Sequence, residues 1–206
     1  MVSIVYILIN DSMPGLVKIG LTSTSLEQRI RELDTTSVPL PFKCYYAAEV
    51  SNAAFVEGKL HVAFGDFRVR SSREFFRIDP FRVKAALEIA ALADVTPRAD
   101  VLTEPSDAEA LEANAARAGR FRMSQAEVPV GATLTFARDE SVRATVVDDT
   151  TIDFEGKRTS LSNAALIAIR RLGYEWKAIQ GALYWVYEGE TLLERRDRLE
   201  QARSEQ

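Results

Sequence analysis

Residues 4–33 constrain the fold most strongly, because they hold two short apolar runs, a turn and a helical pattern in close succession. The runs at residues 4–9 and 16–21 are rich in β-branched side chains, and the polar segment between them contains proline followed by glycine. This pattern predicts a β-hairpin. In residues 25–33 apolar side chains recur at the spacing of an amphipathic helix. The sequence therefore predicts a hairpin followed directly by a helix.

Three polar side chains in this stretch are candidates for chemistry. With the turn centred near Ser12, we expect Tyr6 and Lys18 to lie opposite each other on the two strands, and the alternation along the second strand places Lys18 away from its apolar neighbours. Arg29 lies beside the apolar stripe of the helix and can face the hairpin. Alone, Tyr6 in an apolar strand is typical of a core residue. Its combination with Lys18 and Arg29 favours a catalytic role.

This arrangement resembles the GIY-YIG nuclease superfamily, in which two tripeptide motifs lie on adjacent strands and a catalytic arginine lies on the next helix. Val5-Tyr6-Ile7 stands for the first tripeptide, without its glycine, and Lys18-Ile19-Gly20 stands for the second. A Lys-Ile-Gly motif is similar to the branch of the superfamily found in phage and bacterial proteins and in some restriction enzymes. Arg29 follows at the family's spacing. The resemblance implies hydrolysis of DNA phosphodiester bonds with Mg²⁺ or Mn²⁺.

The next segment predicts a strand at residues 42–50 and a helix in which Glu57 and His61, four residues apart, project together. They can form a surface helical pair or part of a site. In the family that the chain resembles, a glutamate on a helix after the third strand binds the metal, and Glu57 stands at that place. His61 can orient water or phosphate, or it can be structural. As the single histidine of the chain, it excludes a zinc site built from several histidines.

Residues 73–76, Arg-Glu-Phe-Phe, resemble a signature that closes the nuclease domain in the Lys-Ile-Gly branch. Glu74 can orient a catalytic group, but a structural ion pair with a neighbouring arginine is favoured. The neighbouring arginines are Arg68, Arg70 and Arg73. Asp79-Pro80 predicts the start of a helix that runs through Leu92.

The composition predicts two α+β domains and a linker. Residues 1–94 are expected to form a small antiparallel sheet flanked by helices, in the manner of a GIY-YIG nuclease domain. Residues 95–126 contain prolines and an acidic, alanine-rich run that would bury little, so we expect a linker with a helical spacer. Residues 127–206 are expected to form a second, smaller domain. Its predicted strands and helices lie at residues 134–136, 143–147, 151–154, 160–173, from 184 and from 191.

Three segments of the second domain resemble the RAMA-type domain that accompanies restriction and DNA-modification proteins. They are residues 131–134, the helix start at residues 160–165 and the Gly-x-x-Tyr-Trp run at residues 181–185. Trp176 and Trp185 are expected in the core rather than as stacking platforms for bases. Basic residues near the helix start are candidates for phosphate contacts, with surface solvation as the alternative. They are Lys157, Arg158, Arg170, Arg171 and Lys177.

Charge and hydropathy restrict the partners. The net charge of −4 disfavours strong non-specific attraction to nucleic acid, so a DNA site must be a local patch. No apolar run reaches the roughly 18 residues of a membrane span, and no secretory signal is evident, so we expect a cytoplasmic protein without membrane contact. Cys44 is the single cysteine, which excludes an internal disulfide.

The expected function is therefore a metal-dependent DNA endonuclease with a C-terminal DNA-targeting domain, in restriction or mobile-element biology. The ammonium of Lys18 would lower the pKa of Tyr6, which would then act as general base toward water. Arg29 would hold the phosphate and contact DNA, and Glu57 would bind the cation. One alternative is an inactive DNA-binding or protein-interaction adaptor on a nuclease fold. Another is a homo-oligomer or protein complex formed through the C-terminal helix, by Leu192, Leu193 and Leu199.

Overall fold

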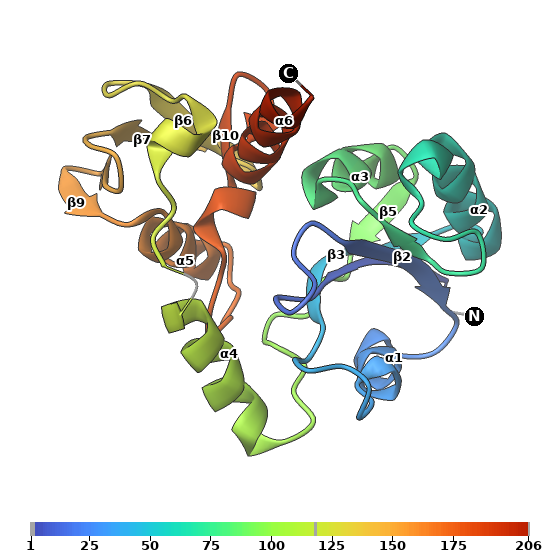
Figure 1. Cartoon of the computed structure of the whole chain (residues 1–206). Helices are drawn as coiled ribbons and strands as arrows, with labels where there is room; N and C mark the ends of the chain where they lie inside the picture. The colour runs from blue at the N-terminus through green and yellow to red at the C-terminus, as the bar shows by residue number, and fades with distance from the viewer. Residues whose placement is uncertain (1–2, 118, 206) are drawn as a thin grey trace. The chain divides into compact units, whose positions relative to one another are not determined.

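The computed structural model describes residues 3–117 and 119–205. The chain divides into two compact units, Met1–Asn114 and Ala115–Gln206, each with its own antiparallel sheet and helices (Figure 1). The predicted α+β class is confirmed for both units. The division falls inside residues 95–126, the range predicted as a linker. No helix in the described parts of the chain is long and apolar enough to cross a membrane.

The first unit is built on a five-stranded sheet whose strands are ordered β4-β2-β1-β3-β5. The predicted hairpin and third strand are present, and β1 lies at the centre of the sheet. The strands are β1 (Ile4–Ile9), β2 (Val17–Thr22), β3 (Lys43–Val50), β4 (Phe75–Phe76) and β5 (Ala91–Asp94). Every residue of β1 is buried, because helices cover both faces of the sheet.

The register of the hairpin differs from the prediction by two residues. Tyr6 lies opposite Gly20, and Lys18 lies opposite Leu8. The expectation that Tyr6 and Lys18 lie roughly opposite each other is therefore off by two positions along the strand. The turn is centred one residue later because the Asn10 side chain accepts hydrogen bonds from the Ser12 amide, at 2.9 Å, and from the Ser12 hydroxyl, at 2.6 Å. A shift by two residues keeps both side chains on the predicted face.

Three helices cover the sheet of the first unit, with α1 on one side and α2 and α3 on the other (Figure 1). They are α1 (Leu26–Leu33), α2 (Ala53–Ala63) and α3 (Pro80–Glu88). Ser25, Asn52 and Asp79 cap their first turns by accepting hydrogen bonds from backbone amides. Leu26 and Ile30 of α1 join the core cluster that includes Tyr6.

The helix predicted to reach Leu92 ends at Glu88. Leu92 lies in β5, which pairs with β3 through Ala48 and Asp94, so the prediction is wrong at this end. The backbone of β5 completes hydrogen bonds along the edge of β3, which a longer helix would leave open. Beyond β5 the chain still belongs to the first unit, because the Val95 amide donates to the Ala47 carbonyl at 2.9 Å.

The predicted helical spacer corresponds to α4 (Pro105–Arg117). Leu111 on this helix is fully buried, so the expectation that the alanine-rich run buries little is wrong at that position. Val95 and Val101 also pack against the core cluster of the first unit. The start of the predicted linker is therefore part of a folded unit.

The second unit contains a six-stranded sheet ordered β11-β10-β6-β7-β8-β9. Its strands are β6 (Thr133–Phe136), β7 (Asp139–Val146), β8 (Ile152–Phe154), β9 (Lys157–Thr159), β10 (Trp185–Tyr187) and β11 (Glu190–Thr191). Its helices are α5 (Leu161–Arg171) and α6 (Leu192–Ser204), with short 3₁₀ turns η2 (Met123–Ala126) and η3 (Gly181–Leu183). The predicted strands and both predicted helix starts are present, whereas β9 and β11 were not predicted.

The Gly-x-x-Tyr-Trp run of the second unit packs against the start of α5. A Cβ on Gly181 would lie 2.4 Å from the Leu161 carbonyl carbon, so only glycine fits there. The Gly181 amide donates to the Ser162 hydroxyl at 3.1 Å, and the Trp185 indole N–H donates to the Leu161 carbonyl at 3.0 Å. Trp185 and Trp176 are buried, as predicted. These motif residues therefore hold the fold together.

The C-terminal helix α6 contacts η2, η3 and β10 of its own unit. Leu192 and Leu193 are buried in this packing, so these two side chains serve the fold of the unit. Leu199 is half-buried. The apolar face of α6 is used for folding because it covers the end of a small sheet.

Candidate active site

The hydroxyl of Tyr6 occupies the space above Gly20 on the neighbouring strand. Tyr6 is fully buried, and a Cβ built on Gly20 would lie 2.6 Å from the Tyr6 Oη and 2.7 Å from its Cζ. Non-bonded carbon and oxygen atoms do not approach so closely, so a side chain at position 20 would displace the phenol. The glycine of the Lys-Ile-Gly motif therefore has a physical reason, which the sequence alone did not reveal.

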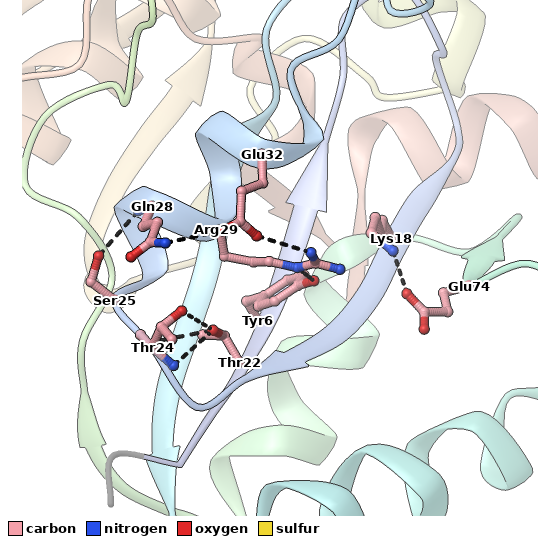
Figure 2. Close-up of polar contacts among 9 residues, drawn as sticks. All are labelled: Tyr6, Lys18, Thr22, Thr24, Ser25, Gln28, Arg29, Glu32 and Glu74. Carbon is pink, nitrogen blue, oxygen red and sulfur yellow. Dashed lines mark hydrogen bonds and ion pairs between the residues drawn. The ribbon is translucent and has the colours of Figure 1, made fainter.

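Arg29 reaches the Tyr6 hydroxyl from α1, as the helical pattern predicted (Figure 2). Its Nε donates a hydrogen bond to Tyr6 Oη at 3.3 Å, and its Nη1 forms an ion pair with Glu32 Oε2 at 3.2 Å. About a third of the side chain, 36%, is exposed, so a ligand can reach the guanidinium. Because Tyr6 Oη accepts from Arg29, the hydroxyl keeps its own proton available for donation.

The environment of Tyr6 favours its neutral form. Burial raises the pKa of Tyr6 above the ordinary 10.0, the hydrogen bond and charge of Arg29 lower it, and the carboxylates of Glu74 and Glu57 raise it. The net shift of the pKa is upward. The prediction that the Lys18 ammonium gives Tyr6 a lowered pKa is therefore wrong for the free protein, in which Tyr6 is a neutral hydroxyl at neutral pH.

Lys18 forms an ion pair with Glu74, which the structure places beside it through the pairing of β2 with β4 (Figure 2). The Lys18 side chain is only 8% exposed, whereas that of Glu74 is 40% exposed. The Lys18 ammonium also lies 5.6 Å from the centre of the Phe75 ring. The favoured structural ion pair of Glu74 therefore exists, but its partner is Lys18 and not one of the neighbouring arginines. The negative charge of Glu74 compensates the buried ammonium of Lys18.

Glu57 and His61 lie together on α2, as their spacing predicted. Glu57 Oε1 is 3.6 Å from His61 Nε2, and both side chains are largely buried. His61 Nε2 also lies 3.1 Å from the Ile19 carbonyl oxygen, next to Gly20. A carbonyl only accepts, so this contact requires the hydrogen of His61 on Nε2. The hydrogen bond of His61 thus connects α2 to β2, the strand that carries the Lys-Ile-Gly motif.

The side chains of the candidate site include few ligands for a divalent cation. Within residues 3–117 and 119–205 no group of three or more histidine, cysteine or acidic side chains could hold a metal ion. Mg²⁺ needs no such cage, because it is often bound through one or two carboxylates together with waters and substrate phosphate. Glu57 has no lysine or arginine partner among the described residues, so its carboxylate fits a site of this open kind.

Apart from Arg29, the basic residues predicted to contact DNA lie in the second unit. Lys157 and Arg158 are exposed on β9, Arg170 is exposed on α5, and Lys177 is exposed in the following loop. Arg171 differs from them, because its Nη2 pairs with Glu155 Oε2 at 2.6 Å and its Nη1 pairs with Glu155 Oε1. Its charge is already compensated.

Within the first unit, the structure brings together the residues predicted from separate segments. Tyr6 and Arg29 share a hydrogen bond, and the charges of Glu57 and Glu74 both act on the Tyr6 hydroxyl. Sequence reasoning missed Glu32, the acidic partner of Arg29, although its i+3 position was a usable signal. It also missed the partnership of Lys18 with Glu74, which no local pattern marks.

Comparison with known proteins bears on the first unit. No curated protein and no solved structure matches the chain. The family model of the T5orf172 domain matches residues 3–91, a range that contains Tyr6, Lys18, Arg29, Glu57 and Glu74. T5orf172 domains occur in phage nucleases and related proteins. The part of the chain that carries the candidate site is therefore similar to the T5orf172 domain, and the match does not extend to the second unit.

Proposed function

We propose that the first unit is a metal-dependent DNA endonuclease of the GIY-YIG type. The observation that supports this most is the Tyr6 hydroxyl, which is held by Arg29 above a glycine and lies within the electrostatic reach of Glu57. The match of residues 3–91 to a domain associated with nucleases supports the same reaction class.

Each of these side chains has a task in phosphodiester hydrolysis. Arg29 binds the phosphate, because its partly exposed planar guanidinium suits two oxygens of one phosphate. Tyr6 first orients water or a phosphate oxygen as a neutral donor. Burial is the largest cause of its raised pKa, with smaller contributions from Glu74 and Glu57, so Tyr6 becomes a general base only when added positive charge at the site offsets both effects. Glu57 would hold Mg²⁺ or Mn²⁺, which supplies charge compensation at the phosphate and the leaving oxygen.

Lys18 and His61 act on this centre through their neighbours. Lys18 holds Glu74, and through it β4, beside the motif strand. His61 holds the Ile19 carbonyl next to Gly20 and lies close to Glu57. We therefore assign both residues to positioning, and Lys18 can contact phosphate only when Glu74 moves away from it.

We further propose that the second unit is a RAMA-like domain that directs the nuclease to DNA, in restriction or mobile-element biology. The residues that produced the resemblance are structural, since Gly181 and Trp185 hold the start of α5. Affinity would instead come from exposed basic groups, namely Lys157, Arg158 and Arg170. Arg171 would contribute less, because Glu155 already pairs with it.

Two observations favour a second function, an inactive DNA-binding adaptor. The ammonium of Lys18 is already paired, and Tyr6 is protonated at neutral pH. A protein that had lost catalysis would tolerate both features.

Cleavage of plasmid and single-stranded DNA by the full chain, with Mg²⁺, with Mn²⁺ and with a chelator, separates the two functions. We expect the wild-type protein to cleave only when metal is present. Glu57→Gln should lose this stimulation while it still binds DNA, and Glu49→Gln, which changes an exposed carboxylate on β3, should cleave like wild type. DNA binding by the wild-type protein without any cleavage would favour the adaptor.

A further inference from the structure

Residues 67–77 form an irregular hairpin that ends in β4. The Val69 amide donates to the Phe75 carbonyl at 2.9 Å, and the Arg77 amide donates to the Phe67 carbonyl at 2.7 Å. The Arg73 amide donates to the Arg70 carbonyl at 3.0 Å and closes the turn between the two arms. The hairpin therefore has a defined backbone.

Four arginines lie on this hairpin without an acidic partner. They are Arg68, Arg70, Arg73 and Arg77. Among the residues that the structure describes, none of the four forms an ion pair with a carboxylate, and the one glutamate of the hairpin, Glu74, is paired with Lys18. Three of them, Arg70, Arg73 and Arg77, are exposed.

Elsewhere the chain compensates its clustered arginines. On α6, Arg195, Arg196, Arg198 and Arg203 each pair with a carboxylate. The four arginines of the hairpin therefore form a local concentration of uncompensated positive charge in a chain whose net charge is −4. Such a patch attracts a polyanion, whereas the chain as a whole does not.

The hairpin is attached to the candidate active site at two points. Glu74 pairs with Lys18, and its carbonyl accepts a hydrogen bond from the Ile19 amide at 3.1 Å. On the other side of β4, the Phe76 ring lies 5.1 Å from the ring of His61. The Arg68 guanidinium lies 5.6 Å from the same Phe76 ring. The arginines therefore flank residues that contact the site directly.

We propose that the hairpin at residues 67–77 binds the sugar-phosphate backbone of DNA beside the cleaved phosphate. This inference rests on the proposed nuclease function and adds the surface that holds its substrate. Guanidinium groups bind phosphate oxygens through two parallel hydrogen bonds, and they carry no sequence information when they contact only the backbone. Arg70, Arg73 and Arg77 supply the contacts, and Arg68 supports the hairpin by donating to the Arg73 carbonyl at 2.7 Å.

The salt dependence of binding measures such contacts. On duplex DNA, removing one arginine that neutralises a phosphate makes the slope of log K against log salt concentration shallower by about 0.9. The triple variant Arg70→Gln/Arg73→Gln/Arg77→Gln should therefore flatten the slope by about 2 to 3. Arg68 is left in place because it stacks on Phe76.

The experiment uses the full chain and a short fluorescent duplex in chelator, so that no cleavage occurs, between about 50 and 200 mM salt. The matched control, Arg196→Gln/Arg198→Gln/Arg203→Gln, removes the same charge from arginines that already have carboxylate partners. We expect weaker binding and a flatter slope for the hairpin variant, and a wild-type slope for the control.

An unchanged slope in the hairpin variant, or equal flattening in both variants, would overturn the inference. If the triple variant does not fold, as judged by its circular dichroism, the single variants Arg70→Gln and Arg73→Gln replace it and should each flatten the slope by about 0.9. A different result would contradict the nuclease proposal without contradicting the hairpin as a DNA-binding surface. A wild-type protein that shows the hairpin-dependent slope but never cleaves DNA would retain the binding surface and lack the reaction.

Discussion

Replacing Gly20 with alanine tests the packing on which the candidate site depends. The new methyl group would lie 2.6 Å from Tyr6 Oη, 2.7 Å from Cζ and 2.9 Å from Cε2, so the fully buried Tyr6 ring or the strand would have to shift. Overpacking of this kind costs about 1–3 kcal/mol. Alanine also reduces the entropy of the unfolded chain, which stabilises the protein by about 0.4–1 kcal/mol. The overpacking should dominate and leave a net loss of roughly 1 kcal/mol or more.

Urea unfolding followed by circular dichroism measures this loss. With a urea m-value of about 2 kcal/mol/M, the midpoint of the first unit should fall by roughly 0.5 M or more. Both tryptophans, Trp176 and Trp185, lie in the second unit, so their fluorescence monitors that unit separately.

Gly58→Ala provides the matched control. A Cβ on Gly58 meets no atom within 4 Å, and the residue lies inside α2, where alanine should stabilise the helix by about 0.5–1 kcal/mol. A neutral or stabilising effect of Gly20→Ala would refute the idea that Tyr6 occupies this space.

Burial and charge lead to three more expected outcomes. The phenolate absorbance of Tyr6, obtained as the difference between wild type and Tyr6→Phe, should develop above pH of about 10, because its pKa is raised. The native state then holds this proton more tightly than the unfolded state, so the Tyr6 contribution to stability is present below that pH and is lost as the pH rises above it. Glu74→Ala should cost about 1–3 kcal/mol in urea unfolding, because Lys18 stays buried without its partner. Limited proteolysis should cut within residues 95–127 and release two folded pieces, identified by mass spectrometry.

Each of these predictions has a result that contradicts it. Ionisation of Tyr6 near neutral pH would contradict its burial beside two carboxylates. A Glu74→Ala protein as stable as wild type would show that the Lys18 ammonium reaches water, and Glu74→Gln serves as its milder control. Protection of the whole range 95–127 from protease would mean that the two units do not separate.

The sequence predicted which face of the sheet each side chain lies on better than it predicted which residues pair across neighbouring strands. The period-two alternation of β1 and β2 identified the face that carries Tyr6 and Lys18, but a shift of two residues leaves every face unchanged. The observed register is accompanied by the hydrogen bonds of Asn10 with Ser12 in the turn and by the close packing of Tyr6 on Gly20, and neither can be read from the alternation. The alternation of apolar and polar residues therefore could not predict that Tyr6 pairs with Gly20.

Local patterns predicted the helices that carry Arg29 and Glu57, because caps and apolar stripes act over a few residues. The ion pair of Lys18 with Glu74 joins residues 56 positions apart, and it forms because β4 completes the edge of β2. Leu92 illustrates the same limit, since its alanine-rich segment locally favours a helix and forms a strand only because β3 offers it hydrogen bonds.

Tyr6 and Arg29 are proposed to form the reaction centre of a nuclease, and their joint role can be measured directly. The measurement is the single-turnover rate of DNA cleavage by the full chain with saturating Mg²⁺, for wild type, Tyr6→Phe, Arg29→Lys and the double variant. Phenylalanine keeps the buried ring and removes the hydroxyl, and lysine keeps the charge and removes the planar fork.

We predict that each single variant cleaves at least about 100-fold more slowly than wild type. The double variant should lose less than the product of the two single losses, because residues that act as a unit are not additive. Cleavage at the wild-type rate by folded Tyr6→Phe or Arg29→Lys would contradict this assignment.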